Sequence, residues 1–221
     1  MSVMRYALSI SRLLLLYLIG SPAVFATEMD FLKPESLCAV VQSEDKQALL
    51  WQQAFGDQRF DLAMALVGNQ NIEIKRVTFG GASEATCHYK TYALARGSDW
   101  GWHLAWVSGA SILSYARMDG EAWVSSPIKK LSKQVQLTGQ LYILAWQQQA
   151  WIVWQGDETQ AGNLYALYSA DEGRNWQEVR EIAKSAVSDS SSLDRLQLAI
   201  KDGQPFMVGD GLKAPVFLVG W

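Results

Sequence analysis

The chain has 221 residues, of which 49% are hydrophobic, and it carries a formal net charge of −3. This mild acidity argues against a nucleic-acid partner, because phosphate backbones are bound by clustered Lys and Arg side chains. After the first 26 residues, no hydrophobic stretch reaches the length of about 20 residues that a membrane-spanning helix needs.

The first 26 residues have the pattern of a secretory signal peptide. Arg5 and Arg12 precede a short apolar run at 13–19, and small residues surround a cleavage point after Ala26. Cleavage there would leave 17 basic and 22 acidic side chains, a net charge of −5. We therefore expect a secreted or periplasmic protein with no stable membrane insertion after cleavage. A membrane anchor that stays attached is the alternative reading.

Two cysteines, Cys38 and Cys87, follow the leader. An even number of cysteines in an oxidising compartment permits one disulfide, which we expect between these two. Two buried free thiols, or a metal site with His88 and His103, are the alternatives. The spacings Cys-x-x-Cys and His-x-x-x-His, typical of zinc sites, do not occur, so we expect neither a metal nor a cofactor.

Four short segments along the rest of the chain look alike. Each is an apolar run, a few polar or turn-forming residues and a second apolar run, which is the pattern of a β-hairpin. The segments are 38–51, 91–106, 141–154 and 196–208. Residues 43–55, read alone, favour a helix, because they contain good helix formers after a capping Ser. Their register with the other three segments favours a hairpin instead.

Further strand-like runs follow each hairpin. Third strands are expected at 60–67, 111–117, 164–169 and 215–220, and fourth strands at 71–77, 121–128 and 175–182. Four strands per unit, repeated about every 50 residues, are typical of propeller blades. We therefore predict an all-β fold, a β-propeller of four-stranded antiparallel blades over 27–221. Its units lie at approximately 38–77, 90–131, 140–183 and 195–221.

The last unit has no fourth strand in its sequence. Either residues near 31–32 complete the ring, or the sequence is part of a larger propeller. Both alternatives stay open at this point.

The stretch SADEGRNW, residues 169–176, falls between the third and fourth predicted strands of the third unit. Ser169 and Asp171 can hydrogen-bond nearby backbone amides, and Gly173 permits a positive φ. Trp176 can then fold onto the apolar surface of the blade. This spacing resembles the Asp box of the bacterial neuraminidase repeat, and all four fixed positions match.

The corresponding turn of the second unit, ARMDGEAW at 116–123, keeps Gly120 and Trp123 of that box. The resemblance covers roughly 38–221 and implies a sialidase-like fold in which the Asp box is a structural turn, remote from the active face. Such repeats occur in sialidases and other glycosidases, and also in non-enzymatic assembly factors and binding proteins. The chain lacks the Arg-Ile-Pro motif of sialidases.

The loop between the second and third strands lies at the opposite end of each blade from the Asp box. In three of the four units it contains Gly-Asp, so closure of a ring would gather carboxylates on one rim. Acidic side chains beside aromatic rings suit sugar or cation binding, and paired carboxylates suit glycosidic hydrolysis. Ordinary turn chemistry is the alternative. The candidate ligand-binding residues are Asp57, Arg59, Asp157, Glu158, Asp210 and Lys213.

These patterns predict an exported, non-catalytic binding or assembly module of the cell envelope, whose partner is an envelope protein or a glycan. The alternative is a glycoside hydrolase or glycan-binding protein related to the sialidases.

Overall fold

The computed structural model describes residues 38–55, 59–67, 73–79, 89–98, 101–109, 111–122, 124–133, 135, 137, 139–156, 163–183, 196–209, 212 and 214–218. The leader predicted over 1–26 and the residues near 31–32 lie outside these ranges, so cleavage and ring closure stay predictions. No helix in the described part of the chain is long and apolar enough to cross a membrane.

The described elements are β-strands arranged in four antiparallel sheets, each in chain order. Sheet 1 comprises β1 (Val41–Gln42), β2 (Ala48–Ala54), β3 (Phe60–Leu66) and β4 (Lys75–Arg76). Sheet 2 comprises β5 (Tyr89–Arg96), β6 (Trp102–Ser108), β7 (Leu113–Met118) and β8 (Lys129–Ser132). Sheet 3 comprises β9 (Leu141–Trp146), β10 (Gln149–Gln155), β11 (Leu164–Ser169) and β12 (Arg180–Ala183). Sheet 4 comprises β13 (Gln197–Lys201), β14 (Gln204–Val208) and β15 (Val216–Phe217).

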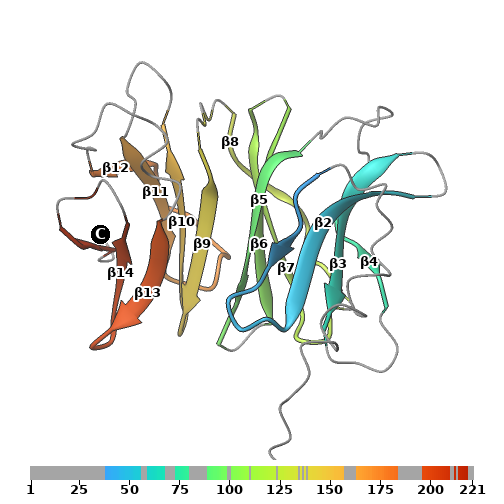
Figure 1. Ribbon diagram of the computed structural model, residues 1–221, viewed down its shortest axis with the longest axis horizontal. Coiled ribbons are helices and arrows are strands. Elements are labelled where there is room, and N and C mark those ends of the chain that lie inside the picture. Colours follow the sequence, from blue (N-terminus) through green and yellow to red (C-terminus); the bar gives the residue numbers. More distant parts are fainter. Residues whose placement is uncertain are drawn as a thin grey trace, which may run out of the picture. The chain divides into compact units, whose positions relative to one another are not determined.

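The all-β propeller architecture predicted from the repeats is confirmed. The opening strands of neighbouring sheets lie side by side, as β5 and β9 do in Figure 1. Each later strand pairs with the one before it, so every sheet extends outward from its opening strand. This is the arrangement of consecutive propeller blades.

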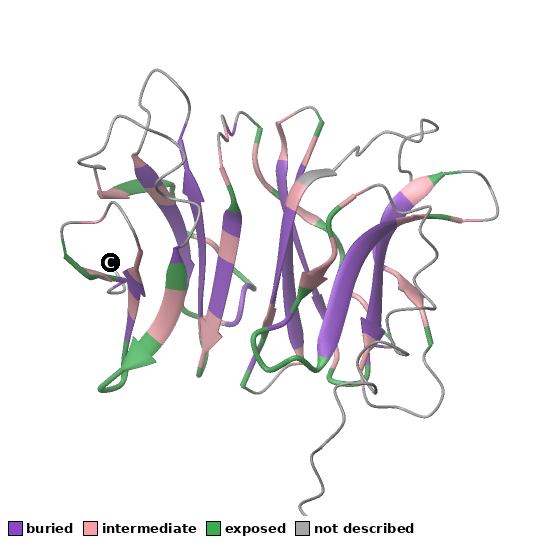
Figure 2. Cartoon of the chain, viewed as in Figure 1, coloured by how far each residue is buried: buried purple, intermediate pink, exposed green. Residues whose placement is uncertain are grey.

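The core lies between the sheets, because the middle strands bury both of their faces. In β6, Trp102 and Leu104 pack toward sheet 1, whereas Ala105 and Val107 pack toward sheet 3. Side chains alternate along a strand, so a strand buried on both faces is read as one continuous apolar run. Full burial of one large apolar side chain stabilises the fold by about 1.5–3 kcal/mol, so these apolar runs supply much of the stability of the sheets. Figure 2 shows the middle strands of sheets 2 and 3 mostly buried.

The helical alternative for residues 43–55 is wrong, because this segment forms the turn between β1 and β2 and then strand β2 itself. The Ser43 side chain closes the turn: its hydroxyl donates to Asp45 Oδ1 at 2.6 Å and accepts from the backbone N–H of Ala48 at 2.9 Å. Lys46 takes a positive φ of 59° there. Local turn chemistry and burial between sheets thus outweigh helix propensity.

The fourth strands differ most from the sequence-based prediction. The strand expected at 121–128 is displaced to β8, and only an isolated bridge joins Met118 to Ser125. Ala122 has a positive φ of 58°, and Pro127 has no N–H to donate to a ladder. The strand expected at 175–182 begins only at Arg180. In sheet 1 the fourth strand is limited to two residues.

Candidate functional site

The predicted Gly-Asp rim is mostly outside the described chain. Asp57, Asp157, Glu158, Asp210 and Lys213 lie outside the described residues, so their grouping stays a prediction. Arg59 is described and exposed. Its carbonyl accepts a hydrogen bond from the Phe55 N–H at 3.0 Å, which closes the loop between β2 and β3.

A charged cluster that sequence reasoning missed lies beside this loop in sheet 1. The Asp61 side chain is fully buried, and Arg76 Nε donates to its Oδ2 at 2.9 Å. The Thr78 hydroxyl donates to the other carboxylate oxygen at 2.7 Å and accepts from the Leu62 N–H at 2.9 Å. A buried carboxylate is tolerated when it is paired and hydrogen-bonded in this way. The register could have revealed the pair, because β4 runs antiparallel to β3 and brings 76–78 opposite 61–63.

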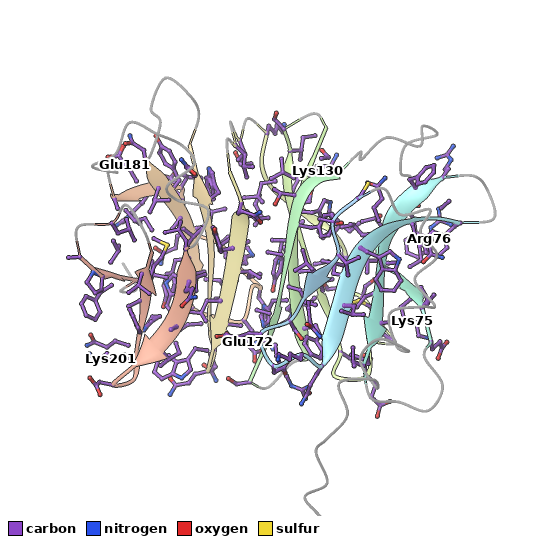
Figure 3. The ribbon with its side chains drawn as sticks, in the orientation of Figure 1. Lys75, Arg76, Lys130, Glu172, Glu181 and Lys201 are labelled. Atoms are coloured by element: carbon purple, nitrogen blue, oxygen red, sulfur yellow. The ribbon has the colours of Figure 1, made fainter. Side chains whose placement is uncertain are left out.

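Two aromatic rings flank the Arg76 guanidinium. Its central carbon lies 4.8 Å from the centroid of the Phe55 ring and 5.3 Å from that of Phe79. The Arg76 side chain is 21% exposed, whereas Phe79 is 72% exposed. We call Phe55, Arg59, Arg76 and Phe79 the Arg76–Phe79 surface. Figure 3 labels Arg76 on sheet 1, and the guanidinium is held between a buried carboxylate and an exposed ring.

Residues 169–176, whose spacing resembles an Asp box, form a closed turn between β11 and β12, which we call the Asp-box turn. The Ser169 hydroxyl donates to Asp171 Oδ1 at 2.8 Å and accepts from the Gly173 N–H at 2.8 Å. Asp171 also accepts from the backbone N–H of Asn175 at 2.7 Å. Burial alone would raise the pKa of Asp171, but its hydrogen bonds with Asn175 and Ser169 and the charge of Lys129 hold the pKa below its ordinary value.

This turn packs onto the neighbouring sheet 2. Trp176 meets the Tyr115 ring edge to face, with ring centroids 4.9 Å apart. Gly173 has a φ of +76°, and the nearest atoms to a β-carbon built there are those of the Tyr115 ring. The turn therefore joins two blades through Gly173 and Trp176, while Arg174 and Asn175 are exposed to solvent.

Beneath the turn, a buried polar cluster also spans the two sheets. His103 Nδ1 and the Tyr115 hydroxyl are hydrogen-bonded at 2.6 Å, and Arg117 Nη1 donates to the Glu172 carbonyl at 2.9 Å. Arg117 also forms an ion pair with the Glu172 carboxylate at 3.4 Å. Figure 3 shows Glu172 at the lower end of the sheets.

Burial and the nearby Arg117 charge lower the pKa of His103 to about 4. Burial raises the pKa of the Tyr115 hydroxyl, against the lowering effect of Arg117. Both groups are therefore neutral near pH 7, and the cluster is suited to fastening sheet 2 to sheet 3.

Hollows in the surface of the described residues include the following two. One, of about 280 Å³, lies by the opening strands β5 and β9 and is lined by Glu44, Asp45, Leu94, Ala95, Arg96, Ile143, Leu144 and Ala145. The other, of about 410 Å³, is lined by Ser98, Gln147, Gln148, Gln149 and Ala170. Among the described residues, no group of three or more His, Cys, Asp or Glu side chains is placed to hold a metal ion.

The disulfide expected between Cys38 and Cys87 is not settled by the described residues. Cys38 is not a free cysteine. Cys87 lies outside the described ranges, so the pairing of the two stays a prediction.

No protein-family model and no curated protein matches the chain. Among solved structures, it is similar to a mutant of the Bombyx mori GH32 beta-fructofuranosidase in complex with sucrose, with 12% identity and a TM-score of 0.41. That match covers 87% of this chain and 48% of the enzyme. A second structure of the Bombyx mori enzyme has 10% identity and a TM-score of 0.37, covering 80% of this chain and 43% of the enzyme. The chain thus spans about half the length of these enzymes, and the fold described above rests on its own strands and sheets.

Proposed function

We propose that this chain is an exported, non-catalytic β-propeller that binds an envelope protein through the Arg76–Phe79 surface. Export is supported by the leader pattern at 1–26, with its basic start, short apolar middle and small residues before the cleavage point. Binding is supported by the side chains that sheet 1 presents beside the loop between β2 and β3.

The observation that carries the proposal is the exposed Phe79 ring next to a guanidinium that is already fixed in place. Phe79 is 72% exposed, and Arg76 is held by Asp61 from one side and stacked on two rings. Aromatic and Arg side chains dominate the binding energy of protein interfaces. A side chain that is ordered before binding loses less conformational freedom when the partner arrives, which favours affinity.

The charged groups buried between strands and sheets serve the fold itself. Asp61 pairs with Arg76, and Arg117 pairs with Glu172. Each of these charged side chains is paired with another protein group, so we assign these residues to stabilising the fold and not to catalysis. This supports a binding role for the propeller.

The test is capture of partners from envelope extracts of the native host, with the chain from residue 27 to 221 as bait. We expect a specific partner that is retained by the wild type and lost with Phe79→Ala. Phe217→Ala is the matched control, because Phe217 is another exposed phenylalanine, 52% exposed, on sheet 4. Equal capture by the wild type and Phe79→Ala would refute the assignment of the surface.

Glycoside hydrolysis is the competing function, and the predicted rim carboxylates would perform it. Turnover of an aryl-glycoside panel by the wild type, abolished by Asp57→Asn, Asp157→Asn and Asp210→Asn, would replace the binding proposal with a hydrolase.

A further inference from the structure

The hollow of about 410 Å³ lies at the end of sheets 2 and 3 that carries the Asp-box turn. Ser98 comes from the turn between β5 and β6, Gln147 and Gln148 form the turn between β9 and β10, and Ala170 belongs to the Asp-box turn. Figure 1 shows the carboxyl ends of β5 and β9 at the lower end of the ribbon and the carboxyl end of β2 at its upper end. Its volume falls within the range of about 300–1,000 Å³ typical of small-molecule sites.

The walls of this hollow are fastened to one another. The backbone N–H of Gln147 donates to Ser98 Oγ at 2.8 Å, which joins the two hairpin turns. The N–H of Glu172 donates to the Gln148 carbonyl at 2.6 Å, which joins the hairpin to the Asp-box turn. Glu172 is itself held by Arg117 of sheet 2. The glutamine side chains therefore project from a backbone that is fixed on both sides.

The backbone at the tip of the hairpin has a positive φ, as it does at Lys46 and Asp202 in the corresponding turns of sheets 1 and 4. Gln147 has a φ of 53°, in the left-handed region that Gly and Asn occupy most readily in two-residue hairpin turns. The side chains of both Gln147 and Gln148 are exposed at this tip.

Four of the five lining residues have uncharged polar side chains, and the fifth is Ala170. A glutamine carboxamide offers an acceptor oxygen and two N–H donors, and a serine hydroxyl both donates and accepts. None of the five lining residues carries a charge. The neighbouring Asp171 is hydrogen-bonded to Ser169 and Asn175. Glu172 is paired with Arg117. Such a surface matches the hydroxyl groups of an uncharged sugar, each of which also donates and accepts.

We propose that this amide-lined hollow is a binding site for an uncharged saccharide. The site goes beyond the proposed function, since it lies on other strands and uses other side chains than the Arg76–Phe79 surface. The sugar hydroxyls exchange hydrogen bonds with the carboxamides of Gln147, Gln148 and Gln149 and with the Ser98 hydroxyl.

The experiment screens the chain from residue 27 to 221 against an array of neutral oligosaccharides of the gluco-, manno- and chito- series and of acidic oligosaccharides. Binders are then titrated by calorimetry. We expect neutral sugars to bind and the double variant Gln148→Ala/Gln149→Ala to weaken the binding at least tenfold. Gln177→Ala, an exposed glutamine outside the hollow, is the matched control and keeps wild-type affinity.

A second variant separates binding from folding. Gln147→Gly relieves the positive φ, so it keeps or raises the thermal midpoint while it removes one carboxamide and weakens sugar binding. The proposal is overturned if no neutral sugar binds the wild type, if only acidic sugars bind, or if the glutamine variants bind as the wild type does. Phe79→Ala keeps sugar binding, so failure of the envelope-protein proposal and failure of this one are told apart.

Discussion

The Tyr115 ring of sheet 2 lies directly against Gly173 of the Asp-box turn in sheet 3, so that a β-carbon on Gly173 would overlap the tyrosine hydroxyl. The glycine is required there twice, once by its φ of +76° and once by the close approach of the ring. The Asp-box turn of this chain thus connects two blades.

Gly173→Ala is expected to destabilise the fold by about 2–4 kcal/mol, since it adds a steric overlap to an unfavourable backbone conformation. Urea unfolding measures the change. Gly120→Ala is the matched control, because Gly120 lies in the corresponding turn of sheet 2 and a β-carbon there meets no atom within 4 Å. Similar losses for the two variants would contradict the role given to Tyr115.

His103 makes the stability of the fold depend on pH. Burial, with the Arg117 charge, lowers the pKa of His103 from 6.5 to about 4. Between these two pH values the unfolded chain binds a proton on His103 that the folded chain does not bind. The contribution of His103 to the free energy of unfolding is therefore fully present above pH 6.5 and is lost as the pH falls toward 4. The full loss is on the order of 3 kcal/mol.

Urea unfolding at pH 7.5 and pH 5 tests this dependence. The wild type is expected to lose stability between the two values, and His103→Gln to lose markedly less. An equal pH dependence in both proteins would show that another group is responsible.

The Asp61–Arg76 pair supplies a third prediction. Arg76→Met leaves the buried Asp61 carboxylate without its guanidinium and is expected to cost about 3 kcal/mol of unfolding free energy. The double variant Asp61→Leu/Arg76→Met removes both charges and is expected to recover most of that loss. A double variant that is less stable than Arg76→Met would contradict the account of a paired buried charge.

The Cys38–Cys87 bridge is checked by counting thiols on the exported protein, unfolded without reductant. We expect no reactive thiol. Two reactive thiols would reject the bridge and favour free cysteines.

The hairpins could be predicted from the sequence because a strand that is buried on both faces has an unbroken apolar run. Trp151, Ile152, Val153 and Trp154 alternate between the two neighbouring sheets, so the middle of strand β10 is an unbroken apolar run. The outer strands have no such apolar run. β8 and β12 have exposed positions and short ladders, and their limits depend on turns such as the one at Ala122.

The candidate sites were harder to predict. The Asp61–Arg76 pair depends on the register between β3 and β4, and a charged residue inside an apolar run gives no sign of its partner. The glutamines at 147–149 suggest only a turn in the sequence. The contact of Gln147 with Ser98 depends on the packing of sheet 2 against sheet 3, which local sequence does not encode.

The most direct test of the central claim, binding of an envelope protein through the Arg76–Phe79 surface, is photo-crosslinking in the native host. A photoreactive phenylalanine analogue replaces Phe79 in one strain and Phe217 in another. We predict a discrete crosslinked envelope protein from position 79 and none from position 217. No adduct at position 79, or the same adducts from both positions, would contradict the account.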